Sequence, residues 1–239
     1  DGKPVKVDLD RQLLKPLAGT GKMFCYDSPE YVKDMGTPDR YYSVCADYRE
    51  GRVTGKNLKN KQKAIFLDRD GTINKYVGFL RNIDEFELLD GAAEAIRKIN
   101  ESGYLAIVAT NQPVIARGEV SFDELEEIHN KMETLLGKEG AYLDAIYYCP
   151  HHPHKGYDGE RPELKIDCDC RKPKPGMLLK AASDFNIDLS QSWMVGDGEN
   201  DIKAGINAGC KTALIGNGKE NLDQMMTVNS LLEFAKKCL

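Results

Sequence analysis

Aspartates follow two of the apolar runs of this chain, and their spacing lets several carboxylates share one site. Asp68 and Asp70 come directly after the run at residues 63–67, and residues two apart in an extended segment point to the same side. Asp197 and Asp201 follow a later apolar run. Carboxylates crowded together repel one another unless a cation joins them, and hard oxygen ligands suit Mg²⁺. These side chains therefore predict a magnesium site.

Groups that suit the oxygens of a phosphoryl group lie at comparable places. Thr110 and Asn111 end another apolar run, while Arg171 and Lys172 stand just before a predicted helix. Hydroxyl, amide and cationic groups of this kind bind phosphate oxygens. Taken singly, each motif has a plain structural explanation, since a D-x-D sequence is common in loops and Asp201 fits the first turn of a helix. Their occurrence at successive strand ends favours a shared site.

Hydrophobic periodicity predicts the elements that must position these residues. Apolar runs predict strands at residues 63–67, 104–110, 145–149, 192–196 and 211–215. Amphipathic stretches with start and stop signals predict helices at residues 90–103, 121–136, 175–186, 199–208 and 230–238. This alternation predicts an α/β fold with a Rossmann-like, mostly parallel sheet and helices on both faces. Such sheets bind ligands at the carboxyl ends of their strands, where the polar residues fall.

The composition excludes several other classes of protein. The 239 residues carry a formal net charge of −5 and show no basic stripe of the kind that binds nucleic acid. No apolar run approaches the roughly 20 residues that span a bilayer, so we expect no membrane segment. Seven cysteines without a visible secretory signal are typical of a reducing compartment. We therefore expect a cytoplasmic protein.

Cysteines and histidines cluster in one part of the sequence. The cluster consists of two close pairs separated by a loop, Cys149 with His151 and Cys168 with Cys170. Four such ligands suit tetrahedral Zn²⁺, and His152 and His154 are further candidate ligands. The alternative is a histidine-rich surface loop with incidental cysteines. A site filled by four protein ligands is structural, so we expect zinc to order the loop at residues 150–170.

The motifs together resemble those of the haloacid dehalogenase superfamily of phosphatases. The match consists of D-x-D-G-T at residues 68–72, Thr110 after the second strand, Lys172, and G-D-x-x-x-D at residues 196–201. It extends from about residue 63 to the end of the sequence. The resemblance implies a phosphatase domain with magnesium as cofactor.

The resemblance also implies a role for each of these residues. Asp68 attacks phosphorus and forms an aspartyl-phosphate, which splits one difficult hydrolysis into two easier steps. Asp70 protonates the leaving alcohol and later deprotonates water. Thr110 and Lys172 hold phosphoryl oxygens, and Asp201 supports the metal site. The implied Mg²⁺ ligands are the carboxylates of Asp68 and Asp197 and the main-chain carbonyl of Asp70.

The sequence is similar to one narrower group, which contains heptose 1,7-bisphosphate 7-phosphatases and histidinol-phosphate phosphatases. The shared segments are DRDGTIN, TNQ, IARG, CPHHP and CDCRKPKPGM. This resemblance implies that the zinc ligands are Cys149, His151, Cys168 and Cys170. It also implies substrate contacts by Arg171, Asn111 and Gln112. No large cap domain is evident between the motifs, so we expect the zinc-bound loop to form a wall that selects the substrate. Pro113, Val114 and Gly198 depart from the group's pattern, which leaves the specificity open.

The first sixty residues differ from the rest in composition and contain few long apolar runs. Residues 1–50 resemble the carboxyl-terminal tail of a sugar-phosphate nucleotidyltransferase, residues 51–62 predict a linker, and residues 63–239 form the phosphatase domain. The alternative is an unrelated extension. A transferase tail implies a bifunctional protein whose fused nucleotidyltransferase makes an activated sugar.

This context favours one substrate among those of the group. We expect the chain to remove the 7-phosphate of D-glycero-D-manno-heptose 1,7-bisphosphate, with histidinol phosphate as the alternative. Two other classes remain open. One is a non-catalytic, zinc-stabilised module that binds phosphorylated ligands. The other is an enzyme that transfers the phosphoryl group to an acceptor other than water.

Overall fold

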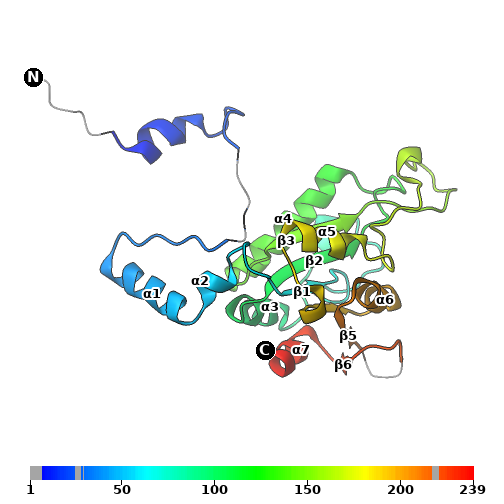
Figure 1. Ribbon diagram of the computed structural model, residues 1–239. Helices are drawn as coiled ribbons and strands as arrows, with labels where there is room; N and C mark the ends of the chain where they lie inside the picture. The colour runs from blue at the N-terminus through cyan, green and yellow to red at the C-terminus, as the bar shows by residue number, and fades with distance from the viewer. Residues whose placement is uncertain (1–6, 25–27, 29, 217–220) are drawn as a thin grey trace, which may run out of the picture.

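A parallel sheet forms the centre of the protein. The computed structural model describes residues 7–24, 28, 30–216 and 221–239. Within them, six strands pair in the order β3-β2-β1-β4-β5-β6, every neighbouring pair parallel (Figure 1). The strands are Ala64–Leu67 (β1), Leu105–Asn111 (β2), Ala145–Cys149 (β3), Trp193–Gly196 (β4), Lys211–Ile215 (β5) and Met226–Val228 (β6). The first five confirm the predicted strands to within one residue at each end.

The sixth strand was not predicted from the sequence. β6 has three residues and pairs with β5 at the edge of the sheet. A segment this short shows no hydrophobic period, and Met226 and Thr227 are only partly buried. Its backbone pairing with β5 is a tertiary feature that local sequence does not reveal.

Helices cover both faces of the sheet, as the alternation of strands and helices predicts. On one face, Ile65 and Leu67 of β1 belong to a core with α3, α4 and α7; on the other, Ala64 and Phe66 belong to a core with α5. α6 packs on this second face, because Gly205 lies against the side chain of Met194. The helices are Ala92–Glu101 (α3), Phe122–Lys138 (α4), Gly176–Asp184 (α5), Glu199–Ala208 (α6) and Leu231–Cys238 (α7). Each predicted helix is confirmed to within two residues at its ends.

The strand order creates a switch point at the centre of the sheet. The chain builds outward from β1 through β2 to β3 and then returns to place β4 on the other side of β1. Ligands of open α/β sheets bind where the order reverses, at the carboxyl ends of the strands. Asp68 follows β1 and Asp197 follows β4, so both stand at this position.

The amino-terminal part of the chain contributes little to the core. The short helical segments Leu9–Leu14 (η1) and Lys15–Leu17 (η2) bury no residue and stand away from the sheet in Figure 1. They are followed by α1, Pro38–Arg49, and α2, Arg52–Gly55. α2 is a single helical turn inside the segment that the sequence predicts as a linker. None of the described helices combines the length and apolar character needed to cross a bilayer.

Candidate active site

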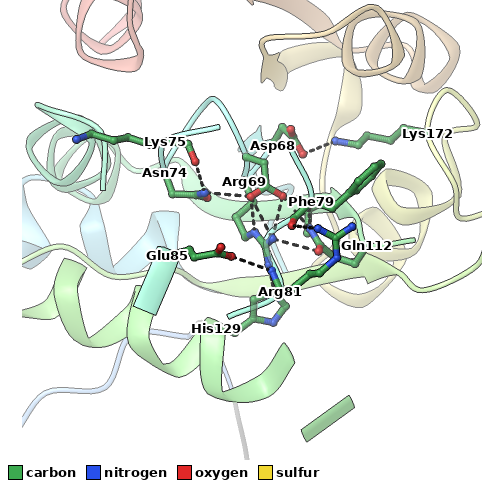
Figure 2. A network of polar contacts seen from close by, with 12 residues as sticks. Asp68, Arg69, Asn74, Lys75, Phe79, Arg81, Glu85, Gln112, His129 and Lys172 are labelled. Atoms are coloured by element: carbon green, nitrogen blue, oxygen red, sulfur yellow. Dashed lines mark hydrogen bonds and ion pairs between the residues drawn. The ribbon is translucent and has the colours of Figure 1, made fainter. Parts of the chain in front are cut away.

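A buried lysine joins two carboxylates at the switch point. Nζ of Lys172 donates a hydrogen bond to Oδ1 of Asp68 at 2.7 Å and lies 2.6 Å from Oδ1 of Asp201. Figure 2 shows the Lys172 side chain pointing directly at Asp68. Lys172 is only 3% exposed, so its charge needs these partners. The structure thus brings together the predicted nucleophile, the predicted lysine and the final aspartate of the G-D-x-x-x-D motif.

Three aspartate carboxylates lie near a single buried lysine at this site. Burial raises the pKa of Asp68 to about 7. The charge of Lys172 opposes this shift, and the charge of Asp201 adds to it. Burial and Asp201 also raise the pKa of Asp197 to about 6. For Lys172, burial favours the neutral form, but Asp201 and Asp68 outweigh it and raise the pKa. Uncompensated negative charge therefore remains, and a divalent cation would balance it.

Three of these carboxylates are close enough to hold such a cation. One oxygen each of Asp68, Asp197 and Asp201 lies within 4.8 Å of the others. Gly71, at φ +83°, makes room for this arrangement, because a Cβ atom there would overlap Oδ2 of Asp197. Clustered carboxylate oxygens of this kind fit Mg²⁺.

Three donors hold the carboxylate of Asp70. Its Oδ2 accepts hydrogen bonds from Arg69 Nη2 at 2.8 Å and from Gln112 Nε2 at 3.0 Å, and its Oδ1 accepts one from Asn74 Nδ2 at 3.0 Å. Burial alone would raise the pKa of Asp70, but Arg69, Asn74 and Gln112 lower it below its ordinary value. Asp70 is therefore a fixed, ionised carboxylate beside Asp68.

Arg69 is a site residue that the sequence analysis did not single out. Its side chain is fully buried and reaches from the end of β1 to Gln112 and to His129 of α4 (Figure 2). Nη1 of Arg69 lies 3.3 Å from Nε2 of His129. Burial and the arginine charge lower the pKa of His129 to about 3, so the imidazole is neutral and accepts the hydrogen bond. No local sequence signal links two residues so far apart in the chain.

The residues at the end of β2 and just after it form hydrogen bonds with one another and with the site. Thr110 is 1% exposed, and its Oγ1 accepts a hydrogen bond from Gln112 Nε2 at 2.9 Å. The amide of Asn111 binds both main-chain groups of Lys172, the N–H and the carbonyl, each at 3.0 Å. Asn111 therefore fixes the backbone that carries the lysine, while its predicted contact with substrate stays a prediction.

A cavity of about 350 Å³ opens above these groups. Its floor holds the carboxylates and Lys172, and its rim includes Arg171, whose Nη1 donates to the carbonyl of His151 at 3.3 Å. A further wall, from the segment after β1, was not predicted to be near the site: Tyr76, Gly78, Phe79 and Leu80. The cavity is large enough for a phosphorylated sugar rather than for phosphate alone.

The predicted zinc ligands converge on one point. The Sγ atoms of Cys149, Cys168 and Cys170 lie 3.2 to 3.5 Å apart, and Nδ1 of His151 lies 3.3 Å from Sγ of Cys170. These separations are too long for a disulfide and suit the edges of a tetrahedron around Zn²⁺. The hydrogen bond with Cys149 lowers the pKa of Cys170, and the same contact raises the pKa of Cys149, so these thiols titrate as a coupled pair, as expected for groups that share one site.

The other two candidate zinc ligands point elsewhere. His152 lies beside the carbonyl of His154 and 3.4 Å from Nη2 of Arg117. The four-residue cluster is thus complete without them and leaves no position open for catalysis.

The fold and the site define a class: an α/β protein with a parallel sheet and two aspartates directly after its first strand. A family model described as HAD-hydrolase-like matches residues 169–232. The chain is 48% identical over 159 residues to D-glycero-beta-D-manno-heptose-1,7-bisphosphate 7-phosphatase of Haemophilus influenzae, covering 66% of this chain and 83% of that protein. The Escherichia coli K12 protein of the same name is 45% identical over 152 residues, covering 64% and 78%.

A similar solved structure belongs to a protein with the same kind of name. D,D-heptose 1,7-bisphosphate phosphatase from B. bronchiseptica, complexed with magnesium and phosphate, is 34% identical with a TM-score of 0.64, covering 74% of this chain and 97% of that one. The chain therefore belongs to the heptose 1,7-bisphosphate phosphatase family of HAD-like hydrolases.

Proposed function

We propose that this protein is a Mg²⁺-dependent phosphomonoesterase that works through an aspartyl-phosphate on Asp68. The observation that carries the proposal is the placement of Asp68 at the floor of the cavity, 2.7 Å from Lys172 and next to the tethered Asp70. A nucleophile, an acid–base group and a cation for the phosphoryl oxygens are the parts that this reaction requires.

In the first half of the reaction, a carboxylate oxygen of Asp68 attacks phosphorus, and the bond from phosphorus to the sugar oxygen breaks. Lys172 and Thr110 hold phosphoryl oxygens as charge builds on them. Asp70 gives its proton to the departing alkoxide. Asp70 is ionised in the free site; the incoming phosphate adds negative charge that raises its pKa, so Asp70 takes up a proton from solvent as substrate binds and passes it to the alkoxide.

In the second half, water attacks the phosphorus of the aspartyl-phosphate, and the bond to Asp68 breaks. Asp70 accepts the proton of the water, a task for which its ionised form is suited. The hydrogen bonds from Arg69, Asn74 and Gln112 keep the Asp70 carboxylate in one orientation for both steps.

The proposal includes both metals. Mg²⁺ would be held by Asp68, Asp197 and the main-chain carbonyl of Asp70, with Asp201 in support, and would neutralise charge between substrate and nucleophile. Zn²⁺ would be held by the cluster of Cys149, His151, Cys168 and Cys170 and would order the loop that ends at Arg171. We also propose a cytoplasmic location, because a zinc site built from these cysteines requires them in the reduced form.

For the substrate, we propose the 7-phosphate of D-glycero-β-D-manno-heptose 1,7-bisphosphate. The names of the relatives support this choice, and so does a cavity large enough for a sugar. We further propose that residues 1–50 are the end of a sugar-phosphate nucleotidyltransferase, joined by residues 51–62 to the phosphatase domain at residues 63–239. The exposed surface of residues 7–24 is consistent with a segment that packs on another domain.

The test is phosphate release with Mg²⁺ from the β and α anomers of the heptose bisphosphate and from histidinol phosphate. We expect the β anomer to give the highest kcat/KM. A preference for histidinol phosphate would keep the mechanism and overturn the substrate. A folded, zinc-loaded protein that releases no phosphate from any of them would overturn the enzymatic proposal.

A further inference from the structure

Arg117 lies between one wall of the catalytic cavity and the loop that joins the two halves of the Cys/His cluster. Its guanidinium carbon is 4.1 Å from the centre of the Phe79 ring and 4.5 Å from the centre of the Tyr157 ring. Phe79 belongs to the wall that follows β1, whereas Tyr157 belongs to the loop that joins the two halves of the Cys/His cluster. One side chain thus contacts an aromatic ring of the cavity wall and an aromatic ring of that loop.

The charge of Arg117 is compensated in an unusual way. Arg117 is 8% exposed, yet no carboxylate among the described residues forms an ion pair with it. The other buried cations, Arg69, Lys165 and Lys172, each pair with an acid. A buried guanidinium loses hydration, and the faces of two aromatic rings replace part of it. The positions of Arg117 and of the two rings are therefore energetically linked.

The loop that carries Arg117 is fixed to the zinc-loop side by its backbone. The N–H of Arg161 donates to the carbonyl of Ala116 at 3.0 Å. Gly118, at φ +72°, packs so closely on Gly159 that a Cβ atom would overlap the Gly159 carbonyl. The backbone on both sides of Arg117 is therefore held in place.

Phe79 needs such support. Its side chain remains 40% exposed while it lines the cavity, so burial alone holds it weakly. A nearby surface arginine, Arg81, adds one hydrogen bond to the Phe79 carbonyl at 3.3 Å. The contact with Arg117 is the shortest of the ring–cation contacts in this region.

We propose that Arg117 is a positioning residue for substrate specificity, which holds Phe79 in place as the cavity wall by stacking it against the zinc-loop side. The role rests on the proposed function and deepens it: the sugar of the bisphosphate packs on this wall, whereas phosphoryl transfer takes place on the floor. Arg117 contacts neither the nucleophile nor the acid–base aspartate, so its loss should weaken substrate binding and leave the chemical step intact.

The test compares Arg117→Met with Arg161→Met. Arg161 lies in the neighbouring loop between Cys149 and Cys168, and its guanidinium carbon lies 5.4 Å from the centre of the Phe122 ring, which does not line the cavity. We expect Arg117→Met to raise KM for the heptose bisphosphate about tenfold, the effect of losing one to two cation–π contacts. kcat, and turnover of the small acetyl phosphate, should stay within about twofold. KM of Arg117→Lys should lie between those of the wild type and Arg117→Met, because lysine keeps the charge but not the planar group.

Unchanged KM in Arg117→Met would overturn the proposal, as would an equal rise in Arg161→Met. Hydrogen exchange of the amides at residues 76–80 gives a readout that needs no substrate. We expect faster exchange there in Arg117→Met than in the wild type or in Arg161→Met, and equal exchange would overturn the positioning role. If the wild type hydrolyses acetyl phosphate but not the bisphosphate, the substrate proposal fails while the exchange experiment still decides the role of Arg117.

Discussion

Lys172 holds Asp68 at 2.7 Å although the two residues are separated by more than a hundred positions in the chain. The contact exists because the loop before α5 returns to the end of β1 at the centre of the sheet. Asn111 fixes the backbone of Lys172, and Asp201 binds the other side of its ammonium group. The proposed nucleophile is therefore oriented by three elements of the fold at once.

Replacing Asp68 with Asn should abolish turnover, because a neutral amide does not attack phosphorus. We expect kcat to fall by at least about 10⁴-fold, the size of effect seen when a nucleophile is removed. Phosphate release from the preferred substrate measures this. Asp184→Asn, on the exposed face of α5, is the matched control and should retain wild-type kcat. Substantial activity in a pure Asp68→Asn sample would exclude the aspartyl-phosphate mechanism.

Replacing Lys172 with Met should destabilise the protein, because it leaves Asp68 and Asp201 facing each other with no buried cation. Removing one partner of a buried ion pair costs about 3 kcal/mol in the free energy of unfolding. Urea unfolding without added Mg²⁺ measures this. Lys180→Met, which removes an exposed ion pair with Asp184, should cost less than about 0.5 kcal/mol. Equal losses in the two variants would contradict the charge balance described for the site.

The sequence was sufficient to predict the strands and helices around the site. Asp68, Lys172 and Asp197 stand at the ends of predicted elements, and parallel topology brings such ends together. The order of strands in the sheet and the short strand β6 depend on pairing between distant segments, which no local period encodes. Helix α1, by contrast, has a local start signal in the sequence, a Thr37 cap followed by Pro38.

The polar support of the site could not be predicted from local patterns. Arg69 looks like a surface residue between two aspartates, yet it is fully buried and pairs with Gln112 and His129. One partner lies just after β2 and the other in α4, so only the folded chain identifies them. The Asn111 amide, which the family resemblance assigns to substrate, binds the backbone of Lys172 for the same reason: the sequence gives the residue type but not its direction.

Removal of zinc should loosen the loop between Cys149 and Cys168. We expect wild-type protein to contain about one zinc per chain, and Cys168→Ser to contain markedly less. Metal analysis measures this directly, and limited proteolysis should cut the variant within residues 150–170. Cys45→Ser changes a cysteine outside the cluster and should retain the metal. Full zinc content in Cys168→Ser would show that the metal does not depend on this ligand.

His129 should make the free energy of unfolding depend on pH. Burial and Arg69 lower its pKa to about 3, and Asp70 opposes this shift only in part. An unfolded histidine binds a proton below its ordinary pKa of about 6.5, whereas the folded one stays neutral, so the unfolded state binds more protons there. The contribution of His129 to stability should therefore fall as pH drops from about 6.5 toward 4, whereas the raised pKa values of Asp68 and Asp197 act in the opposite direction. The effect of His129 is therefore the difference between the wild type and a variant that lacks its imidazole.

The measurement is urea unfolding across this pH range for the wild type and for His129→Gln, whose amide oxygen can still accept from Arg69. We expect the free energy of unfolding of His129→Gln to increase relative to that of the wild type as the pH falls, because the glutamine side chain does not titrate. His154→Gln, which changes an exposed histidine, is the matched control and should keep the wild-type slope. Parallel curves for all three proteins would mean that His129 is protonated in the folded state, and the neutral partner assigned to Arg69 would be wrong.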